Sequence, residues 1–209
     1  MDYNDTRTRI IEAAIKVFLE KGYATATIRG ICAQAEANLA AVNYHFGSKD
    51  SLYAAALERI MASCDASYPI AEGLAEASSP EERLRRFIRN LFRLLFPEDP
   101  EYARRSELIW LGLGNASPAI TVPIERFIRP IKDILESIIQ EILGPVDAEA
   151  LRLCVESIFG QQLFHAQNRA LITHLYPDKM YTPTDVARLA AHVYIFSLAG
   201  LEAVRKCAN

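Results

Sequence analysis

The four cysteines of the sequence, Cys32, Cys64, Cys154 and Cys207, stand too far apart to form a metal or redox motif. Neighbouring cysteines are separated by at least 32 positions, so no CxxC pair occurs. Signatures of catalysis are also missing: there is no GxSxG, no phosphate-cradling glycine loop, no HExxH and no cluster of histidines and carboxylates at ligand spacing. The sequence therefore predicts reduced, buried thiols, no cofactor and no enzymatic activity.

Long hydrophobic runs are absent as well. No segment reaches about eighteen uninterrupted apolar residues, the length that a membrane span requires. The first ten residues carry acids and threonines where a signal peptide needs a basic stretch followed by an apolar run. These features predict a cytoplasmic protein with no membrane partner.

A strong charge of one sign is the third absence. The net charge is -3, whereas proteins that bind nucleic acids usually have a basic excess on at least one face. Residues 1–50 are neutral, because their basic and acidic side chains are equal in number. A nucleic-acid interface in this chain would therefore depend on where individual groups lie, not on bulk charge.

What the sequence does contain is helical periodicity. Apolar side chains recur with a period of about 3.6 residues along almost the whole chain, and no run alternates as a strand does, which predicts an all-α fold. Ile11, Ala14, Ile15 and Phe18 form one face of a first helix, which Gly22 ends. Two short helices follow, one capped by Thr27 and ending near Ala35, the other capped by Asn38 and about seven residues long.

Residues 48–64 predict a long fourth helix, and residues 68–78, interrupted by Pro69 and Gly73, predict a linker. Ser79 to Glu82 form a capping box that opens the next helix, and another helix covers about residues 101–113. A further helix runs from Pro118 or Pro123 to Leu143, with a kink expected at Pro130.

The last two predicted helices, residues 151–164 and 186–204, carry apolar side chains on more than one face. Such helices need cover on both sides. The domain core can cover one side, and the same pair of helices from a second chain can cover the other. This pattern predicts a homodimer formed through the last two helices.

Residues 27–46, TIRGICAQAEANLAAVNYHF, place two short helices around a tight turn at residues 35–38, which is a helix-turn-helix arrangement. The second helix has the size to enter a major groove of DNA. Asn43, Tyr44 and His45 crowd polar and aromatic groups onto this helix, and Lys49 lies where the next helix begins and can meet a phosphate.

Residues 8–53 resemble the DNA-binding domain of TetR-type transcription regulators, through the first helix, GYATATIRGIC and NYHFGSKDSLY. FIRPIKDILESIIQEILG at 127–144 and LRLCVESIFGQQLFHAQNRAL at 151–171 resemble the subgroup related to the regulator CecR. The resemblance implies that the chain approaches the DNA backbone or base edges with the following residues: Thr27, Arg29, Asn38, Leu39, Ala40, Ala41, Asn43, Tyr44 and His45, with Lys49 on a phosphate.

The sequence departs from the family pattern at two positions. Glu36 occupies the turn position where glycine is usual, so it must adopt a left-handed conformation or shift the turn, and it brings a negative charge near the DNA. Asn43 stands where the family commonly has tyrosine, and its amide suits bidentate contact with adenine.

Several of these residues have a second interpretation. Tyr44 and Phe46 can pack the third helix on the first, which is the preferred interpretation for Phe46. An isolated histidine such as His45 is more often a structural hydrogen-bonding group than a base reader. Leu39, Ala40 and Ala41 can offer only backbone and apolar contacts, for example to a thymine methyl group.

Polar residues within the predicted helix around 151–171 suggest an effector pocket, since small-molecule sites are mostly apolar with a few orienting polar groups. Its candidate lining residues are Trp110, Phe127, Gln161, Gln162, His165, Asn168 and Arg169. Contact with solvent or with the dimer partner is the alternative for the five that follow Gly160.

These interpretations combine into one expected function. Residues 1–50 form a three-helix DNA-binding domain, and residues 51–209 form a helical bundle for effector binding and dimerisation. The expected partners are a palindromic double-stranded operator, a second copy of the chain and a small hydrophobic or amphipathic effector that releases the repressor from DNA. An architectural DNA-binding protein and a purely structural helical bundle are the alternatives.

Overall fold

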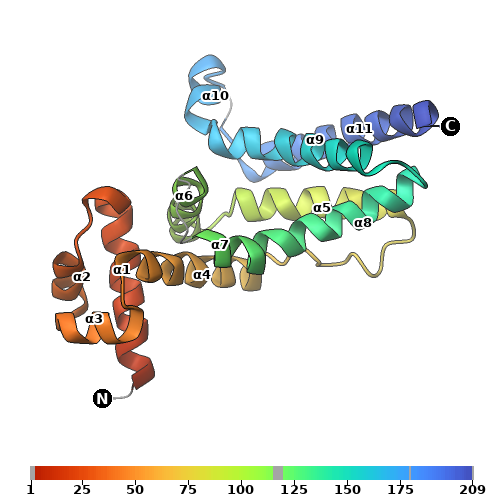
Figure 1. Cartoon of the computed structure of the whole chain (residues 1–209). Coiled ribbons are helices and arrows are strands. Elements are labelled where there is room, and N and C mark those ends of the chain that lie inside the picture. Colours follow the sequence, from red (N-terminus) through yellow and green to blue (C-terminus); the bar gives the residue numbers. More distant parts are fainter. Residues whose placement is uncertain (1–2, 115–119, 179, 209) are drawn as a thin grey trace. The chain divides into compact units, whose positions relative to one another are not determined.

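The structure is a computed structural model that describes residues 3–114, 120–178 and 180–208, with side chains for residues 5–109, 120–178 and 180–207. Every regular element in these ranges is a helix (Figure 1). The chain forms two compact units, Met1–Cys64 with Asp99–Ile128, and Asp65–Glu98 with Arg129–Asn209. The predicted all-α fold is confirmed.

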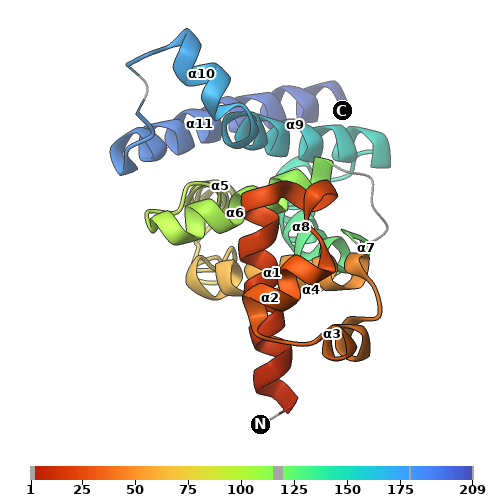
Figure 2. The same ribbon diagram turned by 90° about the vertical axis from the view of Figure 1, so that its left-hand side faces the viewer.

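The first unit is built on the N-terminal helix, against which the first short helix packs, and the second short helix packs on the first (Figure 2). The core between these helices is closed by Ile10, Phe18, Ile31 and Val42, all of which are buried. Its elements are α1 (Tyr3–Thr25), α2 (Ile28–Ala35), α3 (Leu39–Phe46), most of α4 (Lys49–Ser67), α6 (Pro100–Gly114), α7 (Thr121–Pro123) and the π-helical segment η2 (Ile124–Ile128).

The predicted starts and stops of these helices follow from local chemistry. Gly22, at φ 73° and ψ 161°, breaks the helical geometry within α1 near its end. Thr27 Oγ1 accepts a hydrogen bond from Gly30 N, and Asn38 Oδ1 accepts one from Ala41 N, so both predicted N-caps are confirmed.

The predicted helix up to Leu143 is helical from Pro123 onward, but its first part is not a regular α-helix. Pro118 lies outside the described residues, and the segment from Pro123 is divided into the end of α7, the π-helical segment η2 and then α8 (Arg129–Leu143). Pro130 cannot donate a backbone hydrogen bond and its ring crowds the carbonyl one turn earlier. A wider, π-type turn directly before Pro130 accommodates both effects.

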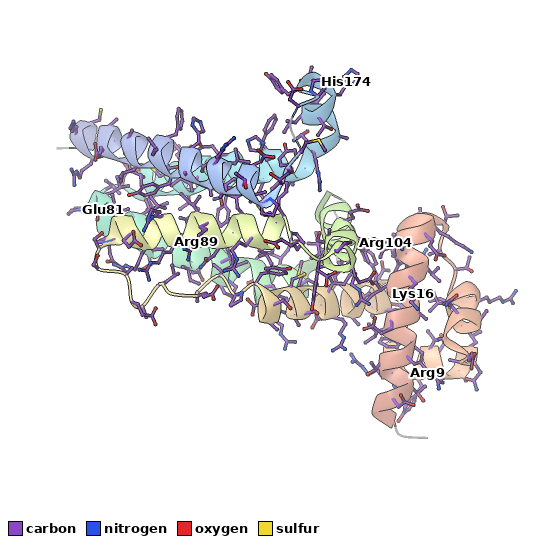
Figure 3. The ribbon with its side chains drawn as sticks, turned by 180° about the vertical axis from the view of Figure 1, so that it is seen from behind. Arg9, Lys16, Glu81, Arg89, Arg104 and His174 are labelled. Atoms are coloured by element: carbon purple, nitrogen blue, oxygen red, sulfur yellow. The ribbon has the colours of Figure 1, made fainter. Side chains whose placement is uncertain are left out.

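The second unit is a bundle in which α5 packs on α8 and α11, and α9 packs on α5, α8 and α11. The short helix α10 projects from the α9 and α11 pair in Figures 1 and 2, and Figure 3 labels His174 on it. A separate helix α10 was not predicted. The bounds of this unit's elements are α5 (Pro80–Leu95), α8 (Arg129–Leu143), α9 (Ala148–Gln167), α10 (Arg169–Leu175) and α11 (Pro183–Ala208).

The capping box predicted at the start of α5 is half realised. Ser79 Oγ accepts a hydrogen bond from Glu82 N at 3.1 Å, as predicted. The Glu82 carboxylate is instead held by two arginines on its own helix, Arg85 at 2.7 Å and Arg86 at 2.9 Å. These hydrogen bonds, first from Arg85 and then from Arg86, lower the pKa of Glu82 from 4.5 to about 2.

Residues 68–78, which we call the strap, were predicted to be a linker. In the structure, hydrogen bonds hold this segment against α5. Asn90 on α5 is buried, and its Nδ2 donates to the carbonyl oxygens of Ile70 at 3.0 Å and Glu72 at 2.8 Å. Arg86 donates to the Gly73 carbonyl at 2.5 Å. The backbone of the strap is therefore fixed to α5 by side chains, and the buried Ile70 and Leu74 close the contact.

The prediction of buried thiols is confirmed for three cysteines and wrong for one. Cys32, Cys64 and Cys154 are buried free thiols, and burial raises the pKa of Cys64 to about 11. Cys207 is exposed in the last turn of α11, directly after Arg205 and Lys206.

Candidate nucleic-acid interface

The turn between α2 and α3 is tight and left-handed. Glu36 adopts φ 49° and ψ 43°, the first of the two conformations that the sequence analysis left open for it. The N–H of Glu36 donates to Ala33 O at 3.4 Å, and the N–H of Ala37 donates to Cys32 O at 3.0 Å. These bonds satisfy the end of α2 and lead directly into the Asn38 cap of α3.

Helix α3 has one buried face and one open face. Val42 and Phe46 are buried, and the guanidinium carbon of Arg7 lies 5.4 Å from the centre of the Phe46 ring. Leu39 and Tyr44 on the open face are 47% and 76% exposed. The structure thus excludes the packing interpretation for Tyr44 within this chain and agrees with it for Phe46.

The other candidate DNA contacts divide in the same way. Thr27, Arg29, Asn38, Ala40 and Asn43 are exposed, whereas Ala41, His45 and Lys49 are half-buried.

Capping already uses part of two of these side chains. Asn38 Oδ1 and Thr27 Oγ1 each accept a backbone hydrogen bond. Asn38 therefore keeps its amide nitrogen, and Thr27 its hydroxyl hydrogen, to offer to a phosphate or a base edge.

Lys49, expected on a phosphate, is held in place by the end of α1. Its Nζ lies 4.4 Å from the centre of the Tyr23 ring and donates to the carbonyl of Ala24 at 3.3 Å. An ammonium group has three hydrogens, so two donors remain for a phosphate. The contacts with Tyr23 and Ala24 fix the position from which these two donors would bind a phosphate.

Tyr23 is a residue whose role the sequence analysis missed. Its hydroxyl donates to the Asp50 carboxylate, and its ring lies 4.7 Å from that of Tyr53, which is 5.0 Å from that of Phe18. Burial, then the hydrogen bond to Asp50, raises the pKa of Tyr23 to about 12. An aromatic residue directly after the helix-breaking Gly22 was the available signal.

The polar candidates for the effector pocket differ in their contacts and burial. Gln161 Nε2 donates to Ser197 Oγ on α11 at 3.2 Å, and Asn168 donates to the Phe164 carbonyl of its own helix at 3.0 Å. Gln162 is fully buried. Each of these three side chains therefore has a different environment.

His165 and Arg169 meet at a residue that the sequence analysis did not select, Tyr181. The Tyr181 hydroxyl lies 3.3 Å from His165 Nδ1, and the Arg169 guanidinium carbon lies 5.4 Å from the ring centre. The ring stacks on Phe96 at 5.0 Å, and the buried Tyr181 has a left-handed φ of 52°. Only tertiary structure brings these groups together, so no local pattern could have identified Tyr181.

The two aromatic candidates belong to the first unit. Phe127 lies in η2, is half-buried and has the Arg126 guanidinium carbon 5.5 Å from its ring centre. Trp110 lies in α6, and its side chain is outside the described residues.

One helix of the structure, Pro183–Cys207 within α11, is long and apolar enough to cross a membrane by length and composition. A third of its most apolar window, 33%, is buried inside the unit. Among its exposed residues are Ile195 and Phe196, at 67% and 64%. The helix thus has a packed side and an open apolar side.

Two protein families match separate parts of the chain. Residues 10–56 match the bacterial regulatory proteins of the tetR family. Residues 80–201 match the C-terminal domain of the HTH-type transcriptional dual regulator CecR. The first match contains α2, α3 and the start of α4, and the second begins at the first residue of α5.

Curated relatives are transcription regulators. The chain is 33% identical to the dual regulator CecR of Shigella flexneri over 72% of its own length and 70% of that protein. It is 35% identical to the transcriptional repressor NicS of Pseudomonas putida over 40% of its length and 38% of that protein. The chain therefore spans well under half of NicS and about two thirds of CecR.

Solved structures share the fold at low sequence identity. FadR of Bacillus subtilis, crystallised with stearoyl-CoA, has a TM-score of 0.68 at 20% identity, covering 92% of this chain and 98% of that one. FadR of Bacillus halodurans has a TM-score of 0.66 at 21% identity, covering 93% and 95%. With the two family matches and the identity to CecR, the chain belongs to the TetR family of bacterial regulatory proteins and carries a CecR-type C-terminal domain.

Proposed function

We propose that this protein is a cytoplasmic transcription repressor that binds an operator through α3. The observation that carries this proposal is the open face of α3, where Tyr44 and Leu39 remain in solvent beside Asn43 while Val42 and Phe46 anchor the helix. Large apolar and aromatic groups left exposed on a short, capped helix are suited to base edges and thymine methyl groups in a major groove.

Fluorescence anisotropy on DNA from the upstream region of the protein's own gene tests this proposal. The double variant Asn43→Ala, Tyr44→Ala should lose sequence-selective binding, because both side chains lie on the open face of α3. Its fold should be unchanged, since neither residue is buried. If the wild type binds this DNA and random DNA equally, the protein has an architectural role. If it binds neither, the alternative of a purely structural helical bundle remains.

The salt dependence of the same binding tests Lys49. Removing one phosphate contact should reduce the slope of log K against log salt by about 1 in Lys49→Gln. Arg104→Gln is the matched control, since Arg104 is an exposed cation on α6 outside the candidate interface. Equal slopes for both variants and the wild type would remove Lys49 from the interface.

We propose that two copies of the chain associate through α9 and α11. Exposed apolar side chains lie on both helices: Leu153 and Phe164 on α9, and Ile195 and Phe196 on α11. Burying such a surface against its copy stabilises a symmetric dimer, and it accounts for the apolar composition of α11 without a membrane. Regulators of this family act as dimers, and a palindromic operator would match the two-fold axis.

Sedimentation of the purified protein tests the dimer. Ile195→Glu should give monomers, because it would place two charges in the apolar interface. Glu202→Gln, at an exposed position of the same helix, is the control and should remain dimeric. A wild type that sediments as a monomer, or that requires detergent to stay in solution, would contradict the proposal.

We further propose that a small hydrophobic or amphipathic effector binds the second unit and releases the repressor. FadR of Bacillus subtilis is a regulator of the same fold that holds stearoyl-CoA. Binding would shift the dimer away from the state whose two reading helices match major grooves roughly 34–36 Å apart. Mass spectrometry of co-purified small molecules, followed by anisotropy with each of them, would test release. A bound molecule that leaves operator affinity unchanged would refute it.

A further inference from the structure

Gln162 is a polar residue at a core position of α9. The buried side of this helix consists of Leu151, Cys154, Val155 and Ile158, and Gln162 occupies the next position of the same stripe. Its exposed fraction is 0%. Phe159, three residues earlier and thus adjacent on the helix surface, lies 6.1 Å from the ring of Phe87 on α5, so this side of α9 faces the interior of the unit.

The amide of Gln162 has a fixed orientation. Its Nε2 donates to the Ile158 carbonyl one turn earlier, at 3.3 Å. Exchanging the oxygen and nitrogen would bring two acceptors together, so Oε1 must point away from that carbonyl. Oε1 is buried, and none of the described residues donates a hydrogen bond to it.

The other buried polar side chains differ from Gln162. Asn90 donates twice to the strap, Ser106 donates to the Ala103 carbonyl, and Ser197 receives a hydrogen bond from Gln161. A buried carbonyl without a donor is costly, because water satisfies it in the unfolded chain. Such a group needs an explanation, and a bound molecule that supplies the missing donor is one.

We propose that Gln162 Oε1 anchors the hydroxyl or N–H group of an uncharged, otherwise apolar ligand within the second unit. This inference rests on the effector function proposed above and names the chemistry of that effector. A carboxylate or ester group would offer only acceptors to Oε1. An ion at this depth would lack a compensating charge, because the neighbouring stripe is apolar.

Two pairs of probes of matched shape test the proposal, each with one hydrogen-bond donor and one compound that lacks it. These are indole with benzofuran, and 1-hexanol with 1-chlorohexane. Affinities for the full-length protein are measured by calorimetry without DNA. In at least one pair, the compound with the donor should bind the wild type about tenfold more tightly than the compound without it. A factor of this size is what one hydrogen bond contributes. Equal affinities within both pairs, or no binding of any probe, would overturn the proposal.

Variants at two neighbouring glutamines assign the preference to one atom. Gln162→Met keeps the length of the side chain without its carbonyl, so this variant should bind both members of the pair equally. Its ligand-free form should melt at a higher temperature than the wild type, because the costly buried carbonyl is gone. Gln161→Met is the control and should keep the preference, because Gln161 faces Ser197. A preference that persists in Gln162→Met would refute the assignment.

The probe measurements contain no DNA, so they separate this inference from the proposed function. Donor preference in the wild type supports the anchor even if operator binding fails. If the protein binds an operator but shows no donor preference, the proposed repressor function stands and the proposed role of Gln162 Oε1 is wrong. The wild-type comparison also does not depend on whether either variant folds.

Discussion

The turn between α2 and α3 and the strap between α4 and α5 are both irregular segments, yet different interactions hold them. The turn is short and is closed by neighbours in the sequence, Glu36 in a left-handed conformation and Asn38 as a cap. The strap is longer and is closed by Asn90 and Arg86, side chains of the following helix. A connection closed by neighbours in the sequence can be predicted from the sequence. A connection closed by side chains of another helix cannot.

The largest expected effect is at Asn90. Asn90→Leu would leave the carbonyls of Ile70 and Glu72 without their donor, which should cost about 3 kcal/mol in the free energy of unfolding. Urea unfolding measures this loss. Arg93→Leu is the matched control, because Arg93 pairs with the exposed carboxylate of Glu72 and should cost less than about 1 kcal/mol. Similar losses for both variants would mean that the strap is not held through Asn90.

Local chemistry explains which features could be predicted. The caps at Thr27, Asn38 and Ser79 were predicted because each acts on an amide three residues away. The left-handed conformation of Glu36 was one of two possibilities that the local sequence left open, since a non-glycine residue stands there where glycine is usual. The amphipathic pattern of the helices determined the fold class for the same reason.

The features that the sequence did not predict depend on distant residues. In the sequence, Asn90 is one polar residue on an apolar helix face. Its acceptors, the carbonyl oxygens of Ile70 and Glu72, come next to it only when the strap is folded. Tyr181 acquires its neighbours from α9, α10 and Phe96 just after α5, and its backbone conformation has no local signal. The π-helical segment η2 was misassigned because Pro130 predicts a disturbance without fixing its form.

A smaller effect is expected at the cap of α3. Asn38→Ala should destabilise the protein by about 1 kcal/mol, because Ala41 N loses its acceptor, and Asn38→Ser should restore most of the loss. Urea unfolding measures the loss, and hydrogen exchange at the Ala41 amide locates it. If Asn38→Ser is as unstable as Asn38→Ala, the cap is not what closes the turn.

Glu36 should give a still smaller effect, with the opposite sign. Glu36→Gly relieves the left-handed backbone and should stabilise the protein by about 0.5 kcal/mol, since greater freedom of the unfolded chain offsets part of the gain. Removing the carboxylate should also strengthen binding to random DNA.

A second substitution at the same position separates the two causes. Glu36→Gln removes the charge and keeps the side chain, so it should bind random DNA as tightly as Glu36→Gly without being more stable. Thermal melting and anisotropy measure both quantities. A stability gain in Glu36→Gln equal to that in Glu36→Gly would show that charge, and not backbone strain, is the cost at this turn.

Acid should loosen the strap and leave the turn between α2 and α3 unchanged. Glu82 holds Arg86, which in turn binds the Gly73 carbonyl. Because the folded pKa of Glu82 is lowered from 4.5 to about 2, its stabilising contribution is complete above 4.5 and is lost as the pH falls towards 2. Thr27 and Asn38, which cap the helices beside the turn, do not titrate.

Hydrogen exchange, corrected for intrinsic rates, compares the two segments in one sample at about pH 6 and about pH 2. Protection of residues 68–78 should fall at the lower pH, while that of residues 36–41 should not. In Glu82→Gln the strap should be less protected already at the higher pH and should change less between the two. If the wild type and Glu82→Gln lose the same protection, another carboxylate is responsible, and Arg86 holds the strap without help from Glu82.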